Sequence, residues 1–380
     1  MKNIAIACIC LCFSSAVAQK ITDTIHSEKL KQDREITIGL PANYAQNPNK
    51  KYPLVLVLDG DYLFDPFHGV MSYGAYWGDL PEMILVGIHQ NKNDERSYDC
   101  SADEQTGLPD VEGKKFFEFI GLELLPALEK EFRIAPLKIV AGHDISAGFI
   151  NFYLYKNQPL FDGYIALSPQ LASGMVDQLP QRMQEIQKQL FYYQATSDGD
   201  LKSIQKETKL LDEKMLAIQR SSLNYKCDEF KGLSHYSLVP QAIPSALYQF
   251  FALYQPITTT EFNEKIMVLP SGYVDYLTQK YDQLEKTLGL KVPVRINDFK
   301  AIEAAILRNN QFEEFDKLAA LADKYYPKSM LSDYYLGLMF ENLGDFKKAA
   351  KAYQKAYQKQ EIGSLTKDMM LDKSGELMKK

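Results

Sequence analysis

Short apolar runs alternate with helical stretches between Arg34 and Tyr164, and this pattern leaves few folds open to the chain. The runs indicate strands, each closed by polar or turn residues, at residues 35–41, 52–61, 83–90, 137–143 and 163–169. Strands that are joined through helices form a mostly parallel sheet covered on both faces. We therefore expect an α/β domain whose functional groups collect at the carboxyl ends of its strands.

The segment after Ser168 continues the same pattern. It contains a polar helix, then a strand that ends in acids, QLFYYQATSDGD (189–200), and then a long amphipathic helix. Residues 223–254 predict a last strand, a loop that carries His235 and a closing helix rich in large apolar residues. We expect the α/β domain to span residues 27–256 and a polar connector with one helix to follow at 257–297.

The remaining chain, residues 298–380, is helical throughout and repeats itself. Phe312 and Phe346 occupy equivalent places in two copies that are 34 residues apart, which is the tetratricopeptide period. Small residues such as Gly337 and Ala349 allow neighbouring helices to pack closely. Two repeats are fewer than the roughly three that are usually stable alone. We therefore expect this small all-α domain to be stabilised by contact with the first domain or with a protein partner.

The first 18 residues have the layout of a secretory signal peptide. Lys2 precedes an apolar run, and the small residues Ala16 and Ala18 stand where a signal peptidase cuts. No later stretch approaches the roughly 20 apolar residues of a spanning helix. We therefore expect an exported protein, secreted or periplasmic, without a membrane anchor. Its remaining cysteines, Cys100 and Cys227, are not expected to form a disulfide scaffold.

Charge and motif content exclude several classes of function. The formal net charge of −6 does not suit a nucleic-acid partner. The sequence has no His and Cys cluster with zinc spacing and no glycine-rich phosphate loop. We therefore expect neither a metal nor a cofactor, and a small molecule as the substrate or ligand.

The stretch AGHDISAG, residues 141–148, carries the strongest functional signal. It follows a short strand and resembles the sharp turn that presents a nucleophile, with Asp144 at the central position. Asp198 or Asp200 ends a later strand, and His235 follows the last strand. Nucleophile, acid and histidine in this chain order are typical of α/β hydrolases.

Each of these residues also has a purely structural explanation. Asp144 could cap the helix that follows it, the later acids could be turn residues, and His235 could be structural. Ser146 offers a rival nucleophile, although Gly142 then lies four residues before it instead of two. The joint order and the placement at strand ends favour a site made by Asp144, His235 and one of the two acids.

Five segments of the chain carry a resemblance to a known family: LVLVLDGDYLF, MILVGIHQNKNDERSYD, FFEFIGLELLPALEKEFRIAPLKIVAGH, LFDGYIALSPQL and FKGLSHYSLVPQAIPSAL. Together they resemble the esterase family that includes enterochelin esterase and esterase D. The resemblance covers residues 27–256 and implies the α/β-hydrolase fold. Relatives that also carry a tetratricopeptide tail are familiar among exported bacterial proteins, and the tail of this chain is similar.

The family motif G-H-S-x-G-G falls on residues 142–147, so that Asp144 stands where the family has its nucleophilic serine. The resemblance assigns the family's histidine, acid and backbone oxyanion donors to His235, to Asp198 or Asp200, and to Ile145 with Asp61 or Tyr62. Three further residues are candidate substrate contacts, namely Arg96, His143 and Ser146. Arg96 could equally be a surface residue that pairs with a neighbouring acid.

An aspartate at the nucleophile position changes the expected reaction. Haloalkane dehalogenases and epoxide hydrolases use such a carboxylate to attack carbon, after which a histidine activates water. Attack on an ester carbonyl would instead give a high-energy anhydride, and Asp144 could alternatively serve as a general base. We expect a hydrolase with a modified site for an ester-like or other small substrate. The alternative is an inactive relative that binds a ligand or an envelope protein.

Overall fold

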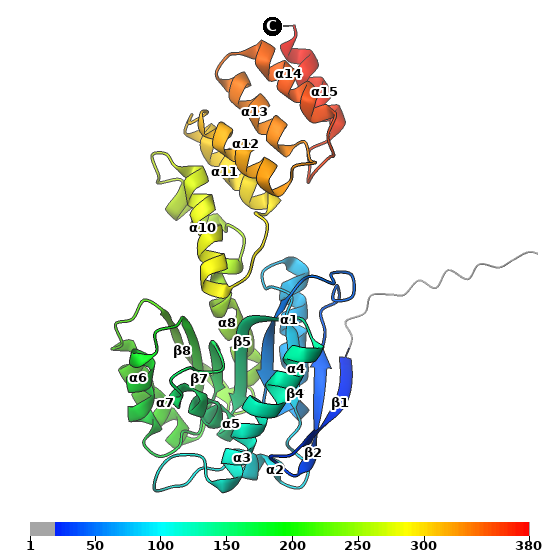
Figure 1. Ribbon diagram of the computed structural model, residues 1–380. Helices are drawn as coiled ribbons and strands as arrows, with labels where there is room; N and C mark the ends of the chain where they lie inside the picture. Colours follow the sequence, from blue (N-terminus) through cyan, green and yellow to red (C-terminus); the bar gives the residue numbers. More distant parts are fainter. Residues whose placement is uncertain (1–19, 380) are drawn as a thin grey trace, which may run out of the picture. The chain divides into compact units, whose positions relative to one another are not determined.

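The computed structural model describes residues 20–379, which divide into two compact units between Phe250 and Phe251. The predicted signal peptide, residues 1–18, lies outside the described residues. The first unit is an eight-stranded sheet flanked by helices, and the second is a run of helices (Figure 1). This architecture confirms the predicted fold class, an α/β-hydrolase-like domain followed by an all-α part.

The sheet is mixed at one edge and parallel elsewhere. Its strands are β1 (Lys20–Ser27), β2 (Gln32–Gly39), β3 (Tyr52–Val57), β4 (Ile84–Ile88), β5 (Ile134–His143), β6 (Gly163–Leu167), β7 (Leu190–Gly199) and β8 (Leu223–Ser234). Their order is β1-β2-β4-β3-β5-β6-β7-β8. β2 pairs antiparallel with both β1 and β4, and the other neighbours are parallel. The carboxyl ends of β3 to β8 therefore share one edge of the sheet.

Helices bury both faces of this sheet. They are α1 (Gly60–Trp77), α2 (Glu95–Asp99), α3 (Val111–Phe119), α4 (Leu125–Glu131), α5 (Ile145–Phe149), α6 (Met175–Glu185), α7 (Lys202–Leu216) and α8 (Val239–Phe250). Phe116 of α3 and Leu211 of α7 join Leu56 of β3 in one buried cluster. Val55 points to the opposite face, because strand side chains alternate, and α1 and α8 pack together against the sheet.

The burial of each strand's side chains explains whether the strand could be predicted from the sequence. Every residue of β3 and β4 is buried, so these strands appear in the sequence as continuous apolar runs. The edge strand β1 has mostly exposed side chains and no apolar run, and the sequence analysis missed it. A strand is therefore predicted from the sequence mainly when its side chains are buried, and less because its residues have a high strand propensity.

The second unit is built from antiparallel helices. They are α9 (Thr259–Glu261), α10 (Tyr273–Leu288), α11 (Ile296–Arg308), α12 (Glu314–Tyr325), α13 (Leu331–Asn342), α14 (Phe346–Tyr357) and α15 (Lys367–Leu377). A Cβ on Gly337 would lie 2.4 Å from the ring of Tyr353, so α13 and α14 approach closely there. Buried Asp298 accepts hydrogen bonds from the backbone of Ile257 and the hydroxyl of Tyr281. The segment 257–297 is thereby packed into this unit.

Several negative findings hold for residues 20–379. None of their helices is long and apolar enough to cross a membrane. No group of three or more His, Cys, Asp or Glu residues among them could hold a metal ion. Cys100 and Cys227 are free, and burial raises the pKa of both thiols, that of Cys227 to about 12. Both therefore remain protonated at neutral pH.

Candidate active site

Asp144 occupies a sharp turn between β5 and α5. Its backbone has φ 60° and ψ −122°, a conformation that side-chain-bearing residues rarely adopt. None of the described N–H groups of α5 is capped by the Asp144 side chain. The helix-cap explanation therefore does not account for this residue.

Main-chain contacts and small residues hold this turn. The carbonyl of Asp144 accepts hydrogen bonds from the N–H groups of Gly148 and Gln170, across 3.1 and 3.0 Å. A Cβ on Gly142 would lie 2.6 Å from the carbonyl carbon of Ser146, and one on Gly148 would lie 1.9 Å from the Gln170 oxygen. The close approach of β5, α5 and the loop after β6 thus requires glycine at two positions around Asp144.

His235 and Asp200 form a hydrogen-bonded pair at the carboxyl ends of the last two strands. Nδ1 of His235 lies 2.7 Å from Oδ1 of Asp200, and Ser168 donates a hydrogen bond to Oδ2 across 2.5 Å. Burial would raise the pKa of Asp200, but the bonds from Ser168 and His235 hold it below its ordinary value. Asp198 is exposed and accepts the N–H of Gly232 instead. Of the two candidate acids, Asp200 is the one beside His235.

The other face of His235 is turned to Asp144. Nε2 lies 4.0 Å from Oδ1 of Asp144, and the two side chains are 13% and 22% exposed. Because Nδ1 donates its proton to Asp200, Nε2 of a neutral ring presents a lone pair toward Asp144. Both side chains are thus partly exposed to solvent. The structure therefore brings Asp144, His235 and Asp200 together in a line.

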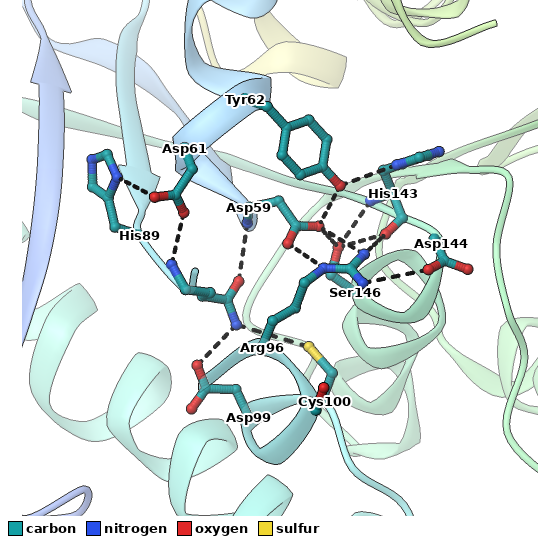
Figure 2. Close-up of polar contacts among 12 residues, drawn as sticks. Asp59, Asp61, Tyr62, His89, Arg96, Asp99, Cys100, His143, Asp144 and Ser146 are labelled. Atoms are coloured by element: carbon teal, nitrogen blue, oxygen red, sulfur yellow. Dashed lines mark hydrogen bonds and ion pairs between the residues drawn. The ribbon is translucent and has the colours of Figure 1, made fainter. Parts of the chain in front are cut away.

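Arg96, from α2, is fixed behind Asp144 by a buried acid. Its Nε donates to Oδ1 of Asp59 across 2.6 Å, and Nη2 donates to the carbonyl of His143 across 2.9 Å. Nη1 lies 3.4 Å from Oδ2 of Asp144, as Figure 2 shows. Burial alone would lower the pKa of Arg96, but Asp59 raises it. Arg96 is thus a permanently charged, immobilised partner of Asp144 rather than a loose surface arginine.

Asp59, which the sequence analysis did not single out, is the centre of this network. It follows β3, is fully buried and has a left-handed backbone with φ 54°. Its Oδ2 accepts hydrogen bonds from Ser146 across 2.6 Å and from Tyr62 across 3.0 Å. The only sequence signal was an acid before Gly60 at a strand end, which is ordinary turn composition.

Ser146 and His143 support the turn and have little surface for a substrate. The Ser146 hydroxyl is fully buried against Asp59, and it also bonds to the main chain of His143. His143 is 1% exposed, and its Nε2 donates to the carbonyl of His235 across 3.1 Å. Burial and the neighbouring His235 lower the pKa of His143, which keeps it neutral. These placements argue against Ser146 as nucleophile and against direct substrate contact by either residue.

The candidate oxyanion donors differ in what they already bind. The N–H of Ile145 is the first of α5, where a helix offers no partner of its own. The N–H of Tyr62 donates to the carbonyl of Asp59 across 3.1 Å. The Asp61 side chain accepts the N–H of Gln90 across 2.9 Å and points away from Asp144 (Figure 2). Of the three candidates, Tyr62 is therefore the one whose main-chain N–H is already bound within its own turn.

Comparison with known proteins identifies the relatives of this chain. The model of the family described as "Putative esterase" matches residues 27–236. The crystal structure of an uncharacterised protein from Capnocytophaga ochracea is 30% identical, with a TM-score of 0.84 over 95% of this chain and 100% of that one. No curated protein sequence matches the chain.

Two more distant structures share the fold. An IroE-like serine hydrolase from Shewanella oneidensis is 21% identical, with a TM-score of 0.62 over 81% of this chain and 100% of that one. The BES protein from Bacillus cereus is 22% identical, with a TM-score of 0.53 over 65% of this chain and 98% of that one. At these identities the likeness extends to the fold alone.

Proposed function

The chain belongs to the Putative esterase family of α/β hydrolases, and from that premise we propose that it is a hydrolase in which the Asp144 carboxylate is the nucleophile. The observation that carries the proposal is the strained turn that aims Asp144 at His235, with 4.0 Å between Oδ1 and Nε2. Such strain costs about 1–3 kcal/mol and is typical of functional sites. A residue that only closed a turn would not require it.

In the first step, an oxygen of Asp144 attacks a saturated carbon of a small substrate. The new C–O bond forms as the bond to the leaving group breaks, and the leaving group departs with the electron pair. Suitable substrates carry a halide, a strained ring oxygen or an activated ester at that carbon. Attack on a carbonyl carbon is disfavoured because it would join two carboxyl groups as an anhydride. The positive charge of Arg96, 3.4 Å from Oδ2, holds the Asp144 side chain in place for this attack.

In the second step, water cleaves the ester that links the substrate carbon to Asp144. Nε2 of His235 takes a proton from the water, whose oxygen attacks Cγ of Asp144. The N–H of Ile145 stabilises the oxyanion that forms. Collapse of this intermediate expels an alkoxide, which receives the proton back from His235. Asp200 orients His235 and stabilises its protonated ring.

An isotope experiment tests which role Asp144 has. Purified mature protein in molar excess over haloalkyl, epoxide or activated-ester substrates is allowed one turnover in water enriched in oxygen-18. A nucleophile places the label in the peptide that contains Asp144 and leaves the first product unlabelled. A label in the product and none in that peptide would show that Asp144 acts as a general base.

A variant provides a matched control for the same chemistry. His235→Gln lacks the base for the second step but retains Asp144, so we expect a stable adduct whose mass is that of protein plus the alkyl group. Asp144→Asn should form no adduct with the same substrates. If both variants turn over substrate as wild type does, the reaction does not use this site.

A second candidate function is an inactive relative that binds a ligand without turnover. It is favoured by the contact of Arg96 with Oδ2 of Asp144, which ties up the carboxylate that would have to react. Here wild type would hydrolyse none of the substrates, while Asp144→Ser would gain activity on short acyl esters. Esterase activity that appears only in Asp144→Ser would replace the first proposal by this one.

Two further parts of the chain belong to the same proposal. Residues 1–18 would direct export to the periplasm or the medium, which mass determination of the secreted protein's N-terminus would test. Residues 298–380 would be tetratricopeptide-like repeats that bind a protein partner. The close packing of Gly337 against Tyr353 supports the repeat assignment, because small residues let neighbouring repeat helices approach one another.

A further inference from the structure

Ser168 directly follows β6, the strand that lies between the turn of Asp144 and the strands of the acid and the histidine. In the sheet β5, β6, β7 and β8 are consecutive neighbours, and β6 is the one of the four that supplies no group to the two steps proposed above. The backbone of Ser168 is left-handed, with φ 49°, and the residue is fully buried. Serine seldom adopts this conformation, so the contacts around the residue must hold it there.

The hydroxyl of Ser168 closes a ring of hydrogen bonds with Asp200 and His235. It donates to Oδ2 of Asp200 across 2.5 Å, and Nδ1 of His235 lies 2.9 Å from its oxygen. Because the hydroxyl proton goes to Asp200, the oxygen is left as an acceptor, and the Nδ1 proton is shared between it and Oδ1 of Asp200. The imidazole therefore loses two contacts whenever it turns away.

The backbone on either side of Ser168 is bonded to the turn of Asp144. The carbonyl of Leu167 accepts the N–H of Asp144 across 3.0 Å, and the N–H of Gln170 donates to the carbonyl of Asp144, also across 3.0 Å. The N–H of Ser168 itself donates to the carbonyl of Ala195 in β7 across 2.8 Å. One short segment thus contacts the main chain of the nucleophile on one side and the acid and the histidine on the other.

We propose that Ser168 is a positioning residue that holds His235 at its working distance from Asp144. This inference rests on the function proposed above and adds a residue that acts through His235. In the proposed reaction His235 is needed only in the second step, where it takes a proton from water. Loss of the Ser168 hydroxyl should therefore slow the second step and leave the first step unchanged. A residue that served only the folding of the domain would affect both steps.

Single-turnover mass spectrometry separates the two steps. With protein in excess over the haloalkyl, epoxide or activated-ester substrate that wild type hydrolyses fastest, the adduct on Asp144 appears in the first step and disappears in the second. We expect Ser168→Gly to slow its disappearance about tenfold, because a hydrogen bond to a charged group is lost, while its formation stays within about twofold of wild type. Glycine is chosen because it adopts the left-handed backbone without strain. Equal slowing of both steps, or of neither, would overturn the proposal.

Ser197→Ala is the matched control. Ser197 lies in the neighbouring strand β7, is also fully buried, and its hydroxyl has no hydrogen-bond partner among residues 20–379. Its loss should leave both steps within about twofold of wild type. If Ser197→Ala slowed the second step as much as Ser168→Gly does, the contacts of Ser168 with Asp200 and His235 would not be the cause, and the proposal would fail.

Proton NMR tests the same contacts without turnover. The Nδ1 proton of His235, shared between two acceptors, should give a resonance far downfield that His235→Gln removes. We expect Ser168→Gly to shift or broaden this resonance and Ser197→Ala to leave it in place. A resonance that is unchanged in Ser168→Gly would overturn the proposal. If wild type hydrolyses nothing and the resonance still responds as expected, the catalytic proposal fails while the positioning of His235 by Ser168 stands.

Discussion

Asp200 holds Nδ1 of His235 at 2.7 Å, and this contact leaves Nε2 as the only ring nitrogen that faces Asp144. The pair fixes both the orientation and the tautomer of the histidine. Asp198 lies two residues away, ends on the surface and bonds to a backbone N–H. The two acids therefore form a natural pair of test and control.

We expect Asp200→Asn to lower kcat by about 10³–10⁴, because an amide favours the wrong tautomer of His235. Asp198→Asn should stay within about twofold of wild type, since its side chain is remote from the ring. Steady-state kinetics on the haloalkyl, epoxide or activated-ester substrate that wild type hydrolyses fastest measures both. Equal losses in the two variants would show that the acid has been assigned to the wrong residue.

The stability contributed by Asp200 should depend on pH. Its pKa in the folded protein is below the ordinary value of 3.8. A group with a depressed folded pKa stabilises the fold at pH values above its unfolded pKa, and this stabilisation is lost as the pH falls through the folded pKa. The free energy of unfolding lost in Asp200→Asn, from urea titrations, should therefore be large at pH 7 and shrink below about pH 4. A loss that is the same at both pH values would contradict this linkage.

Removing the charge of Asp59 should destabilise the first unit. Asp59→Asn leaves Arg96 without its buried anionic partner, and breaking such pairs lowers the free energy of unfolding by about 3 kcal/mol. Asp65→Asn removes a carboxylate from an exposed pair with Lys20 and should cost less than about 1 kcal/mol. Urea denaturation at neutral pH compares them. Similar midpoints for the two variants would mean that the network around Asp59 is not required for stability.

The packing of the loop after β6 on α5 can be tested with a single methyl group. Gly148→Ala places a Cβ against the Gln170 oxygen, and we expect the free energy of unfolding to fall by about 1–3 kcal/mol. Gly69→Ala, in α1 with open space around it, should raise stability by up to about 1 kcal/mol. Thermal unfolding measures both. A Gly148→Ala protein as stable as wild type would mean that this loop moves away easily.

The sequence predicted the fold well, because the central strands bury all their side chains. A run such as LVLV in β3 is stable in an α/β protein only in a strand that is buried on both faces. β1 remained hidden because most of its side chains are exposed and it contains no apolar run. The tetratricopeptide period and the signal peptide stay predictions.

Only part of the site could be predicted from the sequence. Some of its residues are far apart along the chain, and the direction of others depends on strand pairing. Asp59 and Ser146 are 87 residues apart, and nothing local marks the hydrogen bond that joins them. Asp198 and Asp200 could not be separated by alternation, because residues two apart in a strand point to the same face. In the structure the pairing of β7 with β8 shifts between Ser197 and Gly199, and Asp200 is the acid that lies beside His235.

The turn around Asp144 is held by main-chain atoms, by glycines and by the buried hydroxyl of Ser146, and the Asp144 carboxylate caps none of the N–H groups of α5. A different side chain at position 144 can therefore be accommodated while the turn keeps its conformation. Selection can alter the reaction at this position without rebuilding the domain around it. For the engineer, the same independence makes residue 144 the natural place to begin converting one hydrolytic chemistry into another.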